Sequence, residues 1–155
     1  DLMGSPNWET PSEFYLKCLK AFGPFDVDLA ATEKNAKCMD WITEKKDALS
    51  SSWAGLGRAW LNPPYVNLIR WVEKAIEESD NGLLVCMLLP NDTDTKWFHL
   101  LLNRAEIYVT KGRIRFVDPE GGGRSSPRQG HIVALLRPPV PGLTRPTGVL
   151  GRIEV

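Results

Sequence analysis

Residues 58–90 read RAWLNPPYVNLIRWVEKAIEESDNGLLVCMLLP and contain two apolar runs separated by an amphipathic stretch. The first run, residues 58–61, stops at two prolines, which cannot donate to a sheet ladder. Apolar residues then recur at helical spacing from Leu68 to Ile76. Residues 83–89 form an unbroken apolar run, which is typical of a strand buried on both faces. This stretch therefore predicts a strand, a helix and a second, parallel strand.

The same alternation extends in both directions from this unit. Downstream, residues 92–102 predict a capped helix and residues 106–110 predict another strand. Upstream, Thr10-Pro11-Ser12-Glu13 has the form of a capping box at the start of a helix, and residues 25–31 predict a buried strand ending in small side chains. Such alternation favours an α/β fold with a mostly parallel sheet, helices on both faces, and ligand sites at the carboxyl ends of the strands.

The pattern changes after residue 110. Residues 113–117 and 132–136 predict antiparallel strands that close one edge of the sheet, with a glycine-rich loop between them. Residues 138–155 contain four prolines, at positions 138, 139, 141 and 146, and predict an extended arm. Residues 1–137 then make up one domain of ordinary size.

Composition narrows the class of protein. The 155 residues are 43% hydrophobic and 25% charged, which is ordinary for a globular domain and excludes wholesale disorder. No apolar run approaches the ~18 residues needed to cross a bilayer, and the first residues lack the segments of a leader. Cys18, Cys38 and Cys86 suit neither a disulfide framework nor a zinc site. We therefore expect a cytoplasmic protein with no bound metal, no membrane contact and no obligate protein partner.

The balance of 19 basic and 19 acidic residues conceals an uneven distribution. Residues 1–103 have 10 Lys/Arg and 15 Asp/Glu, whereas residues 104–155 have 9 basic and 4 acidic residues. Eight of those nine basic residues are arginines, which suit bidentate contacts with phosphates and guanine edges. The last third of the chain is therefore a candidate surface for a polyanion, with an ordinary solvated surface as the alternative.

Asn62-Pro63-Pro64-Tyr65 follows a predicted strand and suits one particular chemistry. The exocyclic amine of a nucleobase is a poor nucleophile, because its lone pair is conjugated into the ring. The side-chain oxygen of Asn62 and the carbonyl of Pro63 could accept from both amine protons, while Pro63 and Pro64 stiffen the turn. Tyr65 offers an aromatic face for an unstacked base. The tetrapeptide thus predicts a catalytic site for methyl transfer to an exocyclic amine.

Several blocks in the same order resemble the phage-type DNA N6-adenine methyltransferases, the Dam family of phages and prophages. The matching blocks are Trp8, Thr10-Pro11, residues 25–31, residues 35–38, residues 47–49, residues 60–65, Leu89-Pro90, residues 94–99 and residues 112–116. They cover most of the chain to about Leu136. The resemblance implies a Rossmann-like class I methyltransferase fold and S-adenosylmethionine as methyl donor. It also implies N6-adenine in double-stranded DNA as acceptor, and a bacterial host cytoplasm as location.

The resemblance also implies roles for particular residues. Trp8 and Thr10-Pro11 would border the methionine end of the cofactor, and Asp28, Ala30 and Ala31 would lie beneath it. Asp47 would accept from the cofactor's adenine amino group, and Asn62 would lie at the junction with the base. The glycine-rich turn that commonly follows the first strand of methyltransferases is missing from residues 28–32. Asp40 and Glu44 remain open as candidates for the ribose-binding acid.

A second group of residues is predicted to contact DNA. Residues 111–130 combine a mobile Gly121-Gly122-Gly123 loop with five cations, namely Lys111, Arg113, Arg115, Arg124 and Arg128. An exposed hairpin without function is the alternative. His99 and His131 have no acid and nucleophile arrangement around them in the sequence, and we interpret both as structural.

Three other functions remain open on the sequence alone. The tetrapeptide fixes only the geometry around an exocyclic amine, so it equally suits cytosine N4 in DNA. A glutamine amide of a protein is a further substrate for the same chemistry, although an arginine-rich last third favours nucleic acid. A nucleic-acid-binding module that has kept the fold without catalysis is the alternative from another class.

Overall fold

The structure is a computed structural model that describes residues 8–125 and 127–155. The helices are α1 (Ser12–Phe22), α2 (Leu68–Asp80) and α3 (Lys96–Leu102), with a short 3-10 helix, η2, at Ala48–Ser50. The strands are β1 (Val27–Asp28), β2 (Asp40–Trp41), β3 (Ala59–Leu61), β4 (Val85–Pro90), β5 (Glu106–Lys111), β6 (Phe116–Val117), β7 (Arg124–Ser125), β8 (His131–Leu136) and β9 (Gly148–Glu154).

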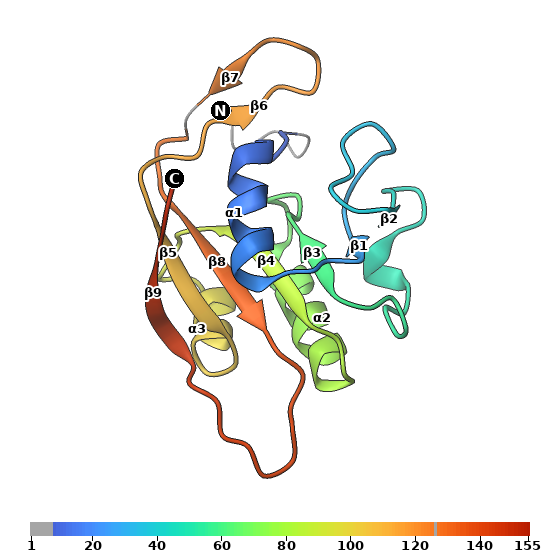
Figure 1. Ribbon diagram of the computed structural model, residues 1–155, viewed down its shortest axis with the longest axis vertical. Helices are drawn as coiled ribbons and strands as arrows, with labels where there is room; N and C mark the ends of the chain where they lie inside the picture. The colour runs from blue at the N-terminus through green and yellow to red at the C-terminus, as the bar shows by residue number, and fades with distance from the viewer. Residues whose placement is uncertain (1–7, 126) are drawn as a thin grey trace.

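Seven of the strands form one sheet in the order β2-β1-β3-β4-β8-β5-β9 (Figure 1). β1, β2, β3 and β4 are mutually parallel, and β8 runs antiparallel to its neighbours β4 and β5. The chain leaves β1 for β2 on one side and returns to β3 on the other side. The predicted fold class, a Rossmann-like α/β fold with a mostly parallel sheet, is confirmed, and its switch point lies between β1 and β3.

The predicted antiparallel region is arranged differently in detail. β8 lies within the sheet, between β4 and β5, where all six of its residues are buried. The prediction that residues 113–117 join this sheet is wrong, because Phe116–Val117 pairs with β7 in a separate two-stranded sheet. The buried side chains of Ile114 and Phe116 anchor that hairpin in the core, while Arg113 and Arg115 are exposed.

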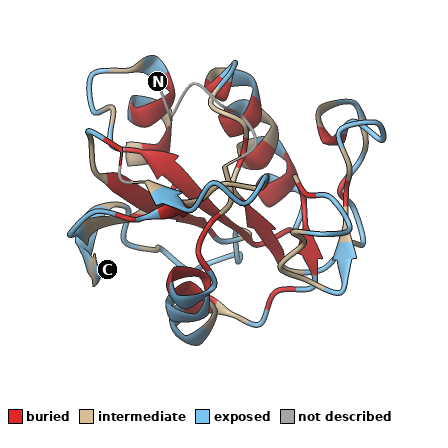
Figure 2. Ribbon diagram, turned by 90° about the horizontal axis from the view of Figure 1, so that it is seen from above, coloured by how far each residue is buried: buried red, intermediate tan, exposed pale blue. Residues whose placement is uncertain are grey.

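The helices cover both faces of the sheet (Figure 2). α1 packs on one face, where Phe14 and Cys18 join Trp60 and Leu88 in one core cluster. α2 and α3 pack on the other face, where Val72 and Leu101 belong to a second cluster. Alternate residues of β4 belong to different clusters, which explains why its sequence is apolar without interruption.

The start of α1 departs from the predicted capping box. Pro11 is the N-cap residue of α1, and no side chain caps the helix. The backbone amides of Phe14 and Tyr15 donate to the Pro11 carbonyl instead. Thr10 and Glu13, the two expected capping side chains, bind Asn62 and Arg124 respectively, so tertiary contacts replace the local ones. At α3 the expected cap is present, because the Thr95 hydroxyl accepts from the amide of Phe98.

The tail differs from the predicted extended arm. Residues 148–154 form β9, which pairs in parallel with β5 at the outer edge of the sheet. Only residues 138–147 form an irregular connection, at the end of the molecule opposite the β6–β7 hairpin (Figure 1). Pairing satisfies backbone groups of β5 that would otherwise remain open, and the exposed surface of β9 lacks the apolar run that marks a buried strand.

The described residues bear on membrane-spanning helices, metal ligands and cysteines. Within them, no helix has the length and apolar character required to cross a membrane, and no cluster of three or more metal-ligating side chains occurs. Cys18, Cys38 and Cys86 are all free thiols. The expected lack of a leader depends on residues 1–4. These lie outside the described residues.

Candidate active site

A cavity of about 400 Å³ opens at the carboxyl ends of β1, β2 and β3, which is the switch point of the sheet. Its size is within the ordinary range for small-ligand sites. Its lining residues are Trp8, Glu9, Thr10, Asp28, Leu29, Ala30, Ala31, Thr32, Asn35, Lys37, Ile42, Thr43, Glu44, Asp47, Ala48, Trp60, Asn62, Pro64, Val66 and Trp71. The lining combines aromatic and aliphatic walls with carboxylates and amides, which suits a ligand with both apolar and polar parts.

Asn62 lies at the end of β3, and its side chain is held by the segment that precedes α1. The Asn62 Nδ2 group donates to the hydroxyl oxygen of Thr10 at 2.9 Å. Because the amide nitrogen is engaged in this way, the Oδ1 atom is left to accept from a ligand. Thr10 is buried, with 3% of its surface exposed, so the hydrogen bond is sheltered from water. This contact joins segments 52 residues apart in the chain.

Asp28, the last residue of β1, is a buried carboxylate at the floor of the cavity. Its oxygens accept from the backbone amides of Ala30, at 3.2 Å, and of Lys37, at 3.0 Å. Burial raises the pKa of Asp28 to about 6, although both hydrogen bonds act in the opposite direction.

Two further acids line the cavity. Glu44 follows β2 and is exposed, and Asp47 is the N-cap residue of η2. Asp47 has a left-handed backbone with φ of 56°, and its Oδ2 atom accepts from the Ser50 hydroxyl at 2.7 Å. The structure separates the two candidates for a ribose-binding acid, since Glu44 lines the cavity and Asp40 does not.

Of the other three residues of the Asn62-Pro63-Pro64-Tyr65 turn, one lines the cavity and two lie outside the lining. Pro64 lines the cavity, whereas Pro63 is buried within the turn. The Tyr65 ring is half-buried on the other side of the turn, and its hydroxyl is fully buried. It lies 6.1 Å, between ring centroids, from the imidazole of His131. Burial raises the pKa of Tyr65 well above its ordinary value, so the hydroxyl stays neutral.

Most of the residues predicted for cofactor binding lie together. Those that line the cavity are Trp8, Thr10, Asp28, Ala30, Ala31, Asp47 and Asn62. Pro11 is the exception, because it caps α1 beside Thr10 and lies outside the lining. Sequence reasoning missed Trp71 of α2, which also lines the cavity. It also interpreted His131 as merely structural, and no spacing along the chain connects this residue with Tyr65.

The predicted DNA-contacting segment, residues 111–130, includes a β-hairpin at the end of the molecule where β4 and β5 finish (Figure 1). The antiparallel bridge between Glu9 and Val117 ties this hairpin to the segment that lines the cavity. Arg124 forms an ion pair with Glu13 of α1, and Lys111 with Glu154 at 3.9 Å. Within the described part of the chain, Arg113, Arg115 and Arg128 take part in no ion pair.

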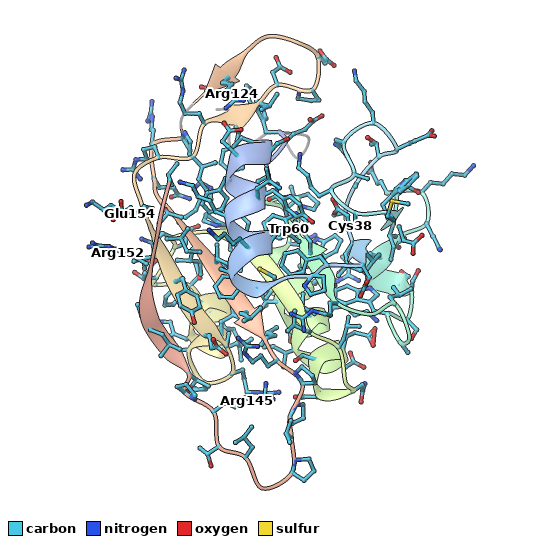
Figure 3. The ribbon with its side chains drawn as sticks, in the orientation of Figure 1. Cys38, Trp60, Arg124, Arg145, Arg152 and Glu154 are labelled. Atoms are coloured by element: carbon cyan, nitrogen blue, oxygen red, sulfur yellow. The ribbon has the colours of Figure 1, made fainter. Side chains whose placement is uncertain are left out.

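The basic residues of the last third do not form one surface. Arg124 lies at the hairpin end of the molecule and Arg145 at the opposite end (Figure 3). Arg137 and Arg145 line a different cavity together with Arg58, and Arg137 also pairs with Glu106. The charge asymmetry seen in the sequence therefore overstates the basic surface, because Arg137 and Arg145 line a cavity away from the hairpin (Figure 3).

Comparisons with known proteins identify relatives of this chain. The family described as DNA N-6-adenine-methyltransferase (Dam) matches residues 4–149. The DNA N-6-adenine-methyltransferase of Escherichia phage T1 is 31% identical over 147 residues, which cover 84% of this chain and 62% of that protein. The protein of the same name from Haemophilus phage HP1 (strain HP1c1) is 33% identical over 139 residues, covering 86% of this chain and 80% of that protein.

A shorter match links the chain to a bacterial protein. The putative methyltransferase YfdM of Escherichia coli (strain K12) is 36% identical over 63 residues, which cover 37% of this chain and 69% of that protein. The chain thus spans under two thirds of the phage T1 protein and most of the phage HP1 protein. From the extent of the family match and the two long alignments, the chain belongs to the DNA N-6-adenine-methyltransferase (Dam) family.

Proposed function

We propose that this chain transfers a methyl group from S-adenosylmethionine to the N6 amine of adenine in double-stranded DNA. Family membership supports the reaction. The hydrogen bond between Thr10 and Asn62 is the observation that supports assigning the reaction to these residues. That bond presents the Asn62 Oδ1 atom as an acceptor at the carboxyl end of β3. An adenine amine needs such an acceptor as its nitrogen becomes tetrahedral.

The cavity fits S-adenosylmethionine by its chemistry. Asp28 is a buried carboxylate with a raised pKa and no ion-pair partner within the described residues, so a cationic ligand would stabilise its charged form. Glu44 and Asp47 offer acceptors for ribose hydroxyls and an adenine amino group, as acids do near other nucleotide sites. When bound, S-adenosylmethionine supplies a methyl group activated by its sulfonium.

Small side chains and aromatic walls complete the fit. Ala30 and Ala31 leave space where β1 ends, in place of the glycine-rich turn common in methyltransferases. Trp8 and Trp71 contribute apolar surface to the lining. The N-terminus of α1 begins beside Thr10, and a helix N-terminus favours a carboxylate such as that of a methionine group.

Asn62 and the Pro63 carbonyl would hold the two protons of the target amine. Pro63 lies buried in a turn and precedes Pro64, which restricts its ψ, so its carbonyl is kept in one direction. Tyr65 would stack on an extruded adenine, since its ring is half-exposed while its hydroxyl points into the protein. The bond to Thr10 would orient Asn62 before substrate arrives, which lowers the reorganisation needed for the reaction.

DNA would lie across the end of the molecule that carries the β6–β7 hairpin. Arg113, Arg115 and Arg128 supply phosphate anchors close to the site, and Arg124 and Lys111 would exchange their ion-pair partners for phosphates. Asn62 lies at the same end of the sheet as this hairpin, because β3 and β5 run in the same direction and finish there. A base extruded from this duplex would reach the cavity along that edge.

The decisive experiment uses the purified chain, unmethylated duplex DNA and isotopically labelled S-adenosylmethionine. The DNA is digested to nucleosides and the labelled base is identified by mass spectrometry. Label on N6-methyladenine is expected, and an Asn62→Ala variant serves as the matched negative control. Label on cytosine N4 would show that the substrate is cytosine, with methyl transfer at the same site. Cofactor and DNA binding without any label would instead support a non-catalytic module, and labelled protein would support a glutamine acceptor.

A further inference from the structure

Two polar side chains beside the Asn62-Pro63-Pro64-Tyr65 turn are buried with unused hydrogen-bonding capacity. Neither the hydroxyl of Tyr65 nor either ring nitrogen of His131 has a partner among the described residues. His131 is only 1% exposed. A buried polar group without a partner costs about 1–3 kcal/mol, so such atoms call for a functional explanation. These three atoms belong to two rings that lie next to each other.

The surroundings of His131 fix its position and its charge. Thr110 holds the backbone of His131 in place. Its hydroxyl accepts from the His131 amide and donates to the His131 carbonyl, each at 3.1 Å. The imidazole packs against Phe116 at 5.0 Å between ring centroids. Burial, with a smaller effect from Arg113, lowers the pKa of His131 to about 4. A neutral imidazole has one donor and one acceptor, which complement the donor and acceptor of a hydroxyl.

Tyr65 is equally constrained from the opposite side. Its ring packs against the core cluster beneath α2, and its centroid lies 6.1 Å from that of His131 with 35° between the ring planes. Burial and the carboxylate of Asp92 both raise the pKa of Tyr65 and keep its hydroxyl protonated. Both groups are buried, unpaired and carried by neighbouring rings, so a rotation of either side chain, or one bridging water, could join the hydroxyl to an imidazole nitrogen.

We propose that His131 is a positioning residue for Tyr65, and that its imidazole hydrogen-bonds the Tyr65 hydroxyl, directly or through one water, when a base stacks on the Tyr65 ring. The inference rests on the proposed function, since it assigns Tyr65 as the stacking surface. The bond would hold the ring at the angle that brings the target amine to Asn62. His131 stands at the start of β8 opposite Pro90 in β4, and therefore on rigid backbone.

A double-mutant cycle with Tyr65→Phe and His131→Phe tests this inference. Tyr65→Phe removes the hydroxyl and keeps the stacking face, and His131→Phe keeps an aromatic ring against Phe116. Each single change is expected to lower the single-turnover methylation rate about tenfold. The double variant is expected to lose about tenfold as well, because both changes remove the same bond. Losses that multiply, or a folded His131→Phe variant with the full rate, would overturn the proposal.

Controls separate positioning from simple folding. His131→Gln, which retains an amide near the position of Nε2, is expected to recover part of the rate and also serves if His131→Phe does not fold. The KM for S-adenosylmethionine should stay unchanged in all variants, since neither residue lines the cofactor cavity. A loss confined to thermal stability, with the rate per folded molecule intact, would show a structural role only.

A spectroscopic measurement distinguishes failure of this inference from failure of the proposed function. The ¹⁵N chemical shifts of the His131 imidazole are compared between the parent chain and Tyr65→Phe, free and with duplex DNA and S-adenosylhomocysteine. The chain has two histidines, so a His99→Asn variant assigns the signals. A shift difference is expected. Identical shifts in both states would overturn the bond even if adenine is methylated, whereas a difference in a chain that methylates nothing would leave the bond intact and reject the reaction.

Discussion

The hydroxyl of Thr10 accepts a hydrogen bond from the side-chain amide of Asn62 at 2.9 Å, across the mouth of the cavity at the carboxyl end of β3. The bond orients an amide that could otherwise present either its oxygen or its nitrogen to a ligand. Pro11 is the N-cap residue of α1, and the hydroxyl of Thr10 before it contacts the site instead of the helix. The proposed catalytic geometry thus depends on a residue in a different segment of the chain.

Replacing Thr10 by valine should misorient Asn62. Valine keeps the shape of threonine without the hydroxyl, so the free amide is expected to sample both orientations and kcat should fall about tenfold, the equivalent of ~1.4 kcal/mol. Thr10→Ser should restore most of the rate. Asn62→Ala, which removes the acceptor itself, should cost about a hundredfold or more. Steady-state kinetics of methyl transfer check these values, and equal rates for Thr10→Val and the parent would contradict the orienting role.

The two acids left open by the sequence can be distinguished by cofactor binding. Glu44→Gln is expected to weaken binding of S-adenosylmethionine about tenfold, because an amide replaces a carboxylate that lines the cavity. Asp40→Asn is the matched control, since Asp40 is exposed and lies outside the lining. Isothermal titration calorimetry of both variants measures the difference. Loss of affinity in Asp40→Asn alone would reverse the assignment.

The basic surface near the site should be revealed by salt dependence. Arg115→Ala and Arg128→Ala remove exposed cations near the hairpin, and each is expected to reduce the slope of log K against log salt by about one. Arg145→Ala is the control, because this arginine lies at the opposite end of the molecule (Figure 3). Fluorescence anisotropy with a labelled duplex over a range of salt concentrations gives the slopes. An effect of Arg145 equal to that of Arg128 would place DNA elsewhere.

The sequence predicted the parts of the fold that depend on local patterns. β4 has the expected extent to within two residues, and α2 begins at the expected Leu68, because unbroken or periodic apolar runs report burial directly. The placement of β8 inside the sheet could not be predicted, since strand order is decided by contacts between distant residues. The same reason explains β9, which pairs with β5 although its own residues are mostly exposed.

The sequence predicted which segments form the candidate site, but it did not predict the contacts between their side chains. Resemblance brought together Trp8, Asp28 and Asn62, which do line one cavity. It could not show that Thr10 binds Asn62, nor that Arg124 is held by Glu13, because each pair joins residues more than fifty positions apart. His131 was overlooked for the same reason, since its relation to Tyr65 exists only after β4 and β8 have paired.

Because of Asp28, the affinity for a cationic cofactor and the stability of the fold should change in opposite directions with pH. The pKa of Asp28 in the folded chain, about 6, is above its usual 3.8. Between these two pH values, Asp28 is therefore protonated in the folded chain and ionised in the unfolded chain. The contribution of Asp28 to the free energy of unfolding therefore falls as pH rises from 4 to 6, by roughly 3 kcal/mol in total. A cationic ligand requires the charged carboxylate, and its affinity should instead rise over the same interval and level off above pH 6.

Calorimetry of S-adenosylmethionine binding from pH 5 to pH 8, beside thermal unfolding of the free chain, measures both responses. Below pH 6 the affinity is expected to fall by up to about tenfold per pH unit, because binding must first displace the proton from Asp28. Asp28→Asn should remove this dependence and weaken binding throughout, since a neutral amide cannot pair with a cation. An affinity that is flat across pH 6 in the parent chain would mean that the cation of the ligand lies away from Asp28, and that this carboxylate only braces the turn through Ala30 and Lys37.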